Sequence, residues 1–319
     1  MNCIESIHSG SSTSHQYDVN GFAGPIDVLT QDEAKHALDE VCTELLVDPD
    51  TQIRKTDRNK GRFKLHLILP TIDSIAHHPL VIEAVQSALQ TRDLCLWSSD
   101  INWKDPNSDG FFAPHQDSTY AGLSPPSKCL TAWIALSDPV GETEGCLSFY
   151  PQSHIRGQLP HEQAIGGGSI QRSKDDNTNI NSNTLSLGQY IAPSQLEKLH
   201  PPTPVAVPLR AGQMTLHSFY TVHASGPNRS SSGPRVGLAL RYFDASAVVQ
   251  TKTNSKEMVT WISSSLDPSG TGIPVSSNMT KNFDLEPRLP PHPTEEDIER
   301  MRKIRDEALR REEANYFGS

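Results

Sequence analysis

Apolar residues recur at helical spacing near the start of the chain. Positions three or four residues apart between Ala34 and Leu45 are apolar, and Thr30 with Glu33 matches a capping box directly before them. This pattern predicts an amphipathic helix that begins after Thr30. Its apolar stripe is expected to pack on the rest of the fold.

Further elements are predicted beyond this helix. The stretch from residue 47 to residue 62 is mostly polar and is expected to be a loop, whereas Phe63–Leu69 has the length and apolar character of a strand. Pro79 suits the first position of a second helix, which apolar residues at helical spacing continue to Leu89.

From about residue 94 onward, short β-rich runs alternate with turn residues. Strands are therefore predicted at Leu94–Trp103, Leu130–Leu136, Leu147–Tyr150, Val205–Leu209, Met214–Tyr220 and Val236–Phe243. Short strands separated by turns are typical of an antiparallel sandwich or barrel. The predicted fold class is an all-β core with flanking α-helices, in one domain.

The two ends of the chain differ from this core. Residues 1–17 are expected to be a flexible leader, residues 18–290 the main domain, and residues 291–319 a charged C-terminal helix. Thr294 and Asp297 have the spacing of a helix start, and the outer face of this helix is expected to be solvated.

A polar insertion rich in glycine, asparagine and serine occupies about residues 165–200. A loop of this length inside a compact domain is usually either disordered or functional, for example as a lid over a binding site. The sequence favours neither alternative.

Composition and charge exclude several kinds of partner. The formal net charge is −10 and the pI is about 5.7, whereas nucleic-acid binding needs clustered cations. No apolar run approaches the roughly 18 residues that span a bilayer, so no membrane partner is expected. The N-terminus does not resemble a secretory signal, and the 5 cysteines have no paired spacing. These features indicate a cytoplasmic protein, and they leave the oligomeric state open.

The tetrapeptide Pro114-His115-Gln116-Asp117 is the sharpest local sign of chemistry. On a strand, residues i and i+2 point to one face, so His115 and Asp117 would aim together while Gln116 points away. An imidazole beside a carboxylate supplies two arms of the facial triad used by non-haem iron(II) enzymes. Because such pairs also occur by chance, a third ligand is required.

The third ligand is expected from a distant strand, and His223 is the candidate. Arg235 follows twelve residues later, where its rigid fork could grip the distal carboxylate of 2-oxoglutarate. Arg241 lies an even number of residues beyond Arg235, so on a regular strand the two would share a face. Arg241 is equally compatible with an anionic substrate and with a salt bridge.

Several motifs in the same order resemble the phytanoyl-CoA dioxygenase family of 2-oxoglutarate oxygenases. The resemblance runs from about Tyr17 to Phe243. It is carried by these blocks: Tyr17–Phe22, His78–Leu80, Lys104, His115–Asp117 with Tyr120, Leu130–Leu136, Glu144–Leu147, Pro151–His154, and Gly212 ahead of His223, Ser225, Gly226 and Asn228. Two features depart from the family's pattern: the loop before Arg235 is one residue longer, and Gln152 replaces the commoner glycine.

The resemblance implies a double-stranded β-helix, or jelly roll, with helices packed on one side. It implies iron ligands at His115, Asp117 and His223. His217 is the less favoured alternative for the third ligand, because no Ser-Gly-x-Asn motif follows it. The residues implied to bind 2-oxoglutarate are Arg235, Ser225, Trp133 and Lys64.

Four residues are further candidates for contact with the substrate: Tyr120, Lys104, His154 and Arg241. For His154, a turn histidine bonded to the backbone is an alternative of equal weight.

The implied reaction converts 2-oxoglutarate and O₂ to succinate and CO₂ while a small organic metabolite is hydroxylated. Asp117 argues against halogenation, because related halogenases replace this carboxylate with a small residue. Two alternatives from other classes remain: a cupin-like metal-dependent hydrolase or isomerase, and a non-enzymatic binding module on the same fold. Formation of succinate in the presence of iron(II) distinguishes them. The sequence does not identify the substrate.

Overall fold

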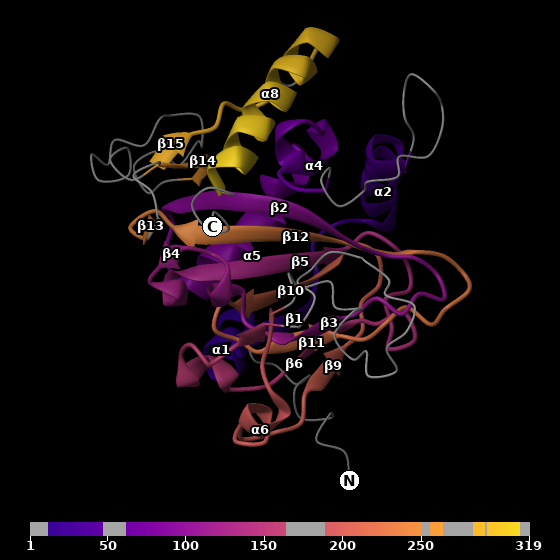
Figure 1. Ribbon diagram of the computed structural model, residues 1–319. Coiled ribbons are helices and arrows are strands. Elements are labelled where there is room, and N and C mark those ends of the chain that lie inside the picture. Colours follow the sequence, from indigo (N-terminus) through magenta and orange to yellow (C-terminus); the bar gives the residue numbers. More distant parts are fainter. Residues whose placement is uncertain are drawn as a thin grey trace.

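Two β-sheets lie face to face in the computed structural model, and helices cover the outer face of the larger sheet (Figure 1). The structure describes residues 12–46, 62–163, 189–249, 256–263, 283–290 and 292–312. The larger sheet has the strand order β1-β10-β5-β12-β2-β14-β15 and the smaller sheet the order β3-β11-β6-β9. Neither sheet closes into a barrel. The predicted all-β core with flanking helices is confirmed.

The strands of the larger sheet are β1 (Phe22–Asp27), β10 (Gln213–Ser218), β5 (Cys129–Ala135), β12 (Arg235–Asp244), β2 (Leu94–Lys104), β14 (Glu257–Ser263) and β15 (Phe283–Leu285). Those of the smaller sheet are β3 (Phe112–His115), β11 (His223–Ser225), β6 (Leu147–Phe149) and β9 (Val205–Val207). Two short pairs complete the strands: β4 (Leu123–Ser124) with β13 (Val248–Val249), and β7 (Glu162–Gln163) with β8 (Gln189–Tyr190). All the predicted strands from residue 94 onward are present.

The helices are α1 (Thr13–Asn20), α2 (Gln31–Leu46), α4 (Pro70–Ala76), α5 (Pro79–Leu89), α6 (Pro193–Leu196) and α8 (Glu295–Glu312). Short 3₁₀ turns lie at Leu65–Leu67, Asp117–Thr119, Pro126–Lys128 and Ser153–Arg156. In Figure 1, α2, α4 and α8 lie on the side of the larger sheet that faces away from β3, β6 and β11. Among the described residues, no helix is long and apolar enough to cross a membrane.

Alternation along the central strands separates an apolar face from a polar one. On β5, Leu130, Ala132 and Ile134 belong to the core that packs against the helices. Thr131 and Trp133 point the other way and line a pocket between the sheets. Strand β12 repeats this division, with its leucines toward the helices and its arginines toward the pocket. The pleat therefore presents Thr131 and the arginines to the pocket, beside an apolar cluster between the sheets that includes Trp133 and Phe149.

The predicted helix starts are confirmed by their caps. Thr30 N donates to Glu33 Oε2 at 2.7 Å, and Glu33 N donates to Thr30 Oγ1 at 3.2 Å, so the capping box of α2 is complete. The same reciprocal bonds join Thr294 and Asp297 at the start of α8. Pro79 is the first residue of α5.

Two sequence predictions differ from the structure. Phe63–Leu69 is not a strand: only Phe63 forms a bridge, with Asp100, before Leu65–Leu67 turns as a 3₁₀ helix. The chain leaves the extended conformation because Lys64 has φ 49°, in the left-handed region. The expected leader is helical from Thr13, since Ser12 caps α1 by accepting a hydrogen bond from His15 N.

Other predictions fall on residues that the structure does not describe. Residues 1–11 of the leader, all of the expected loop except residue 62, and residues 164–188 of the polar insertion lie outside the described ranges. The described end of the insertion contains β8 and α6. The domain boundaries remain predictions.

A buried ionic cluster ties the C-terminal segments to the larger sheet. Lys64 Nζ lies 2.9 Å from Glu286 Oε1 and 3.1 Å from Glu312 Oε1, and it donates to the carbonyl of Trp97 at 2.5 Å. His66 Nε2 lies 3.3 Å from Glu286 Oε2. The side chains of Lys64 and Glu286 are fully buried, so each needs the other to offset the loss of hydration.

Replacing Lys64 with methionine should lower the free energy of unfolding by about 3–5 kcal/mol, because it leaves the Glu286 carboxylate buried without its cation. Urea denaturation followed by circular dichroism measures this change. The double variant Lys64→Met/Glu286→Leu should recover most of the loss, since it removes both charges. Equal destabilisation of the single and double variants would show that the ion pair is not the cause.

Candidate metal centre

Two histidines and one aspartate converge at one end of the smaller sheet. His115 is the last residue of β3, Asp117 begins the 3₁₀ turn that follows, and His223 opens β11, where it pairs with His115 across the strands. Asp117 Oδ1 lies 3.8 Å from His115 Nε2 and 3.6 Å from His223 Nε2. One ligand atom from each residue lies within 4.8 Å of the others, and all three residues are buried. The cluster could hold one metal ion.

Backbone contacts orient both imidazoles toward this point. His115 Nδ1 lies 2.7 Å from the carbonyl of Ala113, and His223 Nδ1 lies 3.0 Å from the carbonyl of Thr221. A carbonyl only accepts, so each Nδ1 carries the proton and each Nε2 keeps its lone pair. Metal-binding histidines are commonly held in this way.

The protonation states also suit a metal. Burial lowers the pKa of both His115 and His223 to about 4, with a further contribution from a neighbouring histidine, so both rings are neutral at pH 7. Burial alone would raise the pKa of Asp117, but His223 and then His217 and His115 hold it well below its usual range. Two neutral imidazoles and one carboxylate make up the facial triad of non-haem iron(II) sites, so the donor set fits iron(II).

The local backbone differs from the sequence prediction although the ligands converge as expected. Strand β3 ends at His115, so Asp117 reaches the site from a 3₁₀ turn rather than from a continuing strand. Gln116 points away, as predicted, and donates to the carbonyls of Gly157 at 2.9 Å and Tyr220 at 2.6 Å. These bonds anchor the turn between the two ligands.

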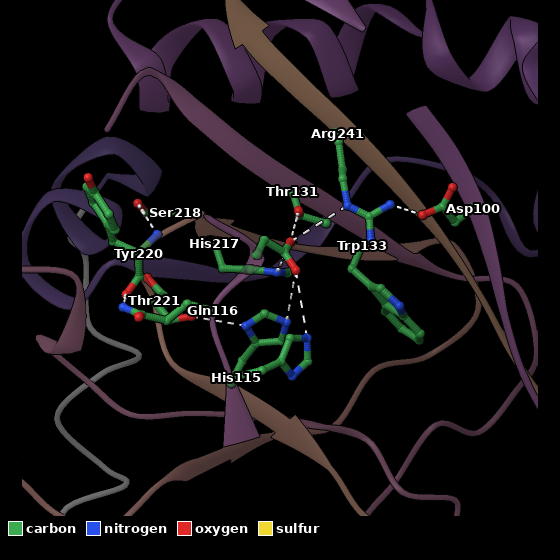
Figure 2. Close-up of polar contacts among 12 residues, drawn as sticks. Asp100, His115, Gln116, Thr131, Trp133, His217, Ser218, Tyr220, Thr221 and Arg241 are labelled. Carbon is green, nitrogen blue, oxygen red and sulfur yellow. Dashed lines mark hydrogen bonds and ion pairs between the residues drawn. The ribbon is translucent and has the colours of Figure 1, made fainter. Parts of the chain in front are cut away.

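Asp117 is surrounded by hydrogen-bond donors from the larger sheet. Thr131 Oγ1 donates to Asp117 Oδ2 at 2.5 Å, and the Tyr120 hydroxyl donates to Oδ1. The dashed lines in Figure 2 run from His115 and from three residues of the larger sheet to one carboxylate, which is that of Asp117; the three are His217, Thr131 and Arg241. Among the described residues, Asp117 therefore has donors on both oxygens.

Arg235 is buried in the same pocket, and some of its N–H groups have no hydrogen-bond partner among the described residues. Its Nη2 donates to the carbonyl of Gly145 at 2.8 Å, whereas Nε and Nη1 are buried without a hydrogen-bond partner among the described residues. The guanidinium lies 4.7 Å from the centre of the Trp133 ring. Burial lowers the pKa of Arg235 to about 10, so it is still a cation at pH 7. A buried cation with free donors suits a carboxylate ligand.

Lys104 lies beside this arginine but is already hydrogen-bonded to the protein. It pairs with Arg235 across β2 and β12, and its Nζ lies 2.6 Å from Ser225 Oγ and close to the carbonyl of Gly226. Burial, and next the charge of Arg235, lowers the pKa of Lys104 to about 5. Lys104 thus holds Ser225 in place, and it is not itself one of the residues that line the pocket.

The structure brings most of the predicted site residues into one pocket. Those that line it are His115, Asp117, His223, Arg235, Ser225, Trp133, Tyr120 and Arg241. The pocket is also lined by residues that were not assigned to the site from the sequence: Asn102, Phe112, Thr131, Leu147 and Ala239, together with His217, which was weighed only as a ligand. Thr131 lies in the Leu130–Leu136 motif, but the sequence alone does not show that its hydroxyl donates to Asp117.

Three predicted residues lie elsewhere. Lys64 is held in the ionic cluster with Glu286, so the structure does not place it at this pocket. Lys104 is not among the residues that line the pocket. His154 Nε2 lies 3.2 Å from the carbonyl of Asp18, which matches the alternative of a turn histidine bonded to the backbone. Gln152, two residues before it, has φ 63°, a conformation that favours glycine.

Comparison with known proteins agrees with this geometry. The family model of phytanoyl-CoA dioxygenase (PhyH) matches residues 17–237. The mouse protein "Phytanoyl-CoA dioxygenase domain-containing protein 1" is 31% identical over 209 residues, which are 66% of this chain and 63% of the relative. The chain thus spans slightly less than two thirds of that relative's length.

Solved structures share the fold. The apo form of the non-haem monooxygenase ThoJ superposes with a TM-score of 0.71 at 24% identity, covering 95% of this chain and 96% of that one. The α-ketoglutarate-dependent carbocyclase SnoK has a TM-score of 0.54 at 25% identity, covering 76% and 87%. The predicted family is confirmed. The chain belongs to the phytanoyl-CoA dioxygenase family, and it has a His-Asp-His cluster that could hold a metal ion.

Proposed function

We propose that this protein is an iron(II)- and 2-oxoglutarate-dependent dioxygenase that hydroxylates a small organic metabolite. The observation that carries the proposal is the occurrence in one buried pocket of a His-Asp-His cluster and an arginine with free donors. His115, Asp117 and His223 would hold iron(II). Arg235 would bind the distal carboxylate of 2-oxoglutarate, with Ser225 and Trp133 beside it.

When bound, iron(II) supplies the oxidation: 2-oxoglutarate and O₂ become succinate and CO₂, and the second oxygen atom enters a C–H bond of the substrate. The residues of the chain bind, orient and exclude water. The two imidazoles offer fixed lone pairs, and Tyr120 and Thr131 hold the carboxylate of Asp117. Burial of all three ligands keeps the site dry, which strengthens its electrostatic interactions.

The Arg235 end of the pocket is built for an anion. The guanidinium is packed by Trp133 and fixed by Gly145, so little side-chain freedom is lost when a carboxylate binds. Ser225 is held by Lys104 with its hydroxyl at the same end. The unpaired Nε and Nη1 groups lie on either side of Nη2, which has a second N–H, so a carboxylate could pair with Nη2 together with either of them.

The proposal also specifies what the oxidation does to the substrate, namely hydroxylation. SnoK is described as a carbocyclase and ThoJ as a monooxygenase, so one fold serves different reactions. We favour hydroxylation because it needs no group beyond the metal, the co-substrate and a bound C–H bond. A cupin-like hydrolase would not require the free donors of Arg235, and neither would a non-enzymatic binding module.

Replacing any one of His115, Asp117 and His223 with alanine should abolish iron(II)-dependent succinate formation, because each supplies one of three ligand atoms to a shared ion. Metal content of the purified variants, measured by mass spectrometry, should fall with activity while circular dichroism stays unchanged. Full metal content and activity in His223→Ala would contradict the assignment of the third ligand.

Arg235→Ala should raise the dissociation constant of 2-oxoglutarate about tenfold to several hundredfold, because a charge-assisted pair is worth roughly 1.5–3 kcal/mol and leaving one partner unpaired can cost more. Arg235→Lys should recover only part of the loss, since a point charge cannot reproduce the fork. Anaerobic calorimetric titration of the iron-loaded variants measures both values.

Arg229→Ala serves as the matched control, because Arg229 is an exposed arginine in the loop that precedes β12, paired with Asp109. It should bind 2-oxoglutarate as the parent protein does. A loss of affinity in Arg229→Ala equal to that in Arg235→Ala would mean that general charge, not the buried fork, controls binding.

A further inference from the structure

We infer that His217, Thr131 and Arg241 form a cradle across three neighbouring strands that holds one oxygen of Asp117 and leaves only the other for the metal. This inference rests on the proposed function for the identity of the metal site. It assigns His217 as a positioning residue that acts through Asp117. The cradle is defined by these three residues.

The strand register places the three side chains in one row. His217 on β10 pairs with Thr131 on β5, and Thr131 pairs in turn with Arg241 on β12. Directly paired residues on neighbouring strands point to the same face with their side chains adjacent. All three line the pocket, so the row faces the metal ligands and not the helices.

The row approaches one oxygen of Asp117, and the histidine ligands face the other. Thr131 Oγ1 is 2.5 Å, His217 Nε2 is 3.6 Å and Arg241 Nε is 3.9 Å from Asp117 Oδ2. The Nε2 atoms of His223 and His115 instead lie near Oδ1, at 3.6 and 3.8 Å. Oδ1 also accepts a hydrogen bond from the Tyr120 hydroxyl, which leaves its second lone pair for a metal. The carboxylate is thereby divided into a cradled oxygen and a metal-facing oxygen.

The two outer members of the row have unused hydrogen-bonding capacity. Both ring nitrogens of His217 and the Nε of Arg241 are buried without a hydrogen-bond partner among the described residues. His217 is 1% exposed, so bulk solvent does not reach its ring. Its Nε2 and Arg241 Nε both lie just beyond hydrogen-bond distance of the same oxygen. A small shift of the carboxylate toward either residue would form the missing bond.

Arg241 is held in place from outside the cradle. Its Nη1 pairs with Asp100, and its Nη2 donates to the Tyr120 hydroxyl at 3.1 Å. Asp100 also accepts from Ser98 at 2.7 Å, which fixes that carboxylate. The cation therefore cannot swing away from Asp117, and its charge is offset by Asp100 as well.

The division of the carboxylate has a chemical consequence. A carboxylate that donates one oxygen occupies one position on a six-coordinate ion, whereas a chelating carboxylate occupies two. With two histidines, an Asp117 that donates one oxygen would leave room on a bound iron(II) for a keto acid and for O₂. Hydrogen bonds to Oδ2 oppose chelation, because they occupy the lone pairs that chelation would use.

The test measures Co(II) binding to the purified full-length chain, with no co-substrate present. His217→Phe keeps a ring but no donor, whereas His217→Gln keeps an N–H group in nearly the same position. Thr131→Val and Thr131→Ser form the same kind of pair. The donor-free variants should bind Co(II) about 10- to 100-fold more weakly, as is usual when an outer hydrogen bond to a ligand is lost.

The donor-retaining variants His217→Gln and Thr131→Ser should recover most of the affinity. The visible absorption spectrum of bound Co(II), which reports coordination number, should change only in the donor-free variants. His36→Gln, at an exposed position on α2, is the control and should match the parent protein.

Equal loss in His217→Phe and His217→Gln would overturn the inference, because a role in packing or as a direct ligand would not be rescued by glutamine. Parent-like affinity and spectrum in both variants would overturn it as well. Failure of the proposed function would give a different result. In that case Co(II) binding would show the expected pattern among the variants, but the protein would form no succinate from 2-oxoglutarate. The role of the cradle would then stand, and the proposal of an oxygenase would be rejected.

Discussion

The buried carboxylate of Asp117 is the charge on which the site depends. A fully buried carboxylate is stable only if donors or cations surround it, and this one has the Tyr120 and Thr131 hydroxyls, three histidine rings and Arg241 around it. The same surroundings keep it ionised by lowering its pKa. A neighbouring metal would thus meet a ligand that is already charged and oriented.

The need to surround a buried carboxylate with donors explains why the site lies between two sheets. The smaller sheet supplies His115 and His223 on paired strands, and the larger sheet supplies Thr131 and Arg241 from its inner face. Its outer face packs on the helices, which hold the strands in register. Arg235 lies on the same strand and face as Arg241, so one strand brings a cation to each end of the pocket. Fold and site therefore follow from one alternating pattern.

The parts that the sequence could predict are those with a local signal. Capping boxes located α2 and α8, and short β-rich runs between turn residues located β5 and β12. Spacing made His223 and Arg235 candidates, and the resemblance to a family then implied the role of each. Lys64 could not be placed, because its left-handed backbone and its pairing with Glu286, 222 residues away, leave no local trace. The role of Thr131 depends on cross-strand register, which one sequence does not contain.

The most direct test of the central claim is an anaerobic titration of 2-oxoglutarate into the purified protein with and without iron(II), followed by visible absorption. Chelation of iron(II) by a keto acid produces a charge-transfer band that neither component shows alone. The account predicts that the band appears and saturates only when protein, iron(II) and 2-oxoglutarate are all present. Saturable iron(II) binding at His115, Asp117 and His223 with no such band would contradict it.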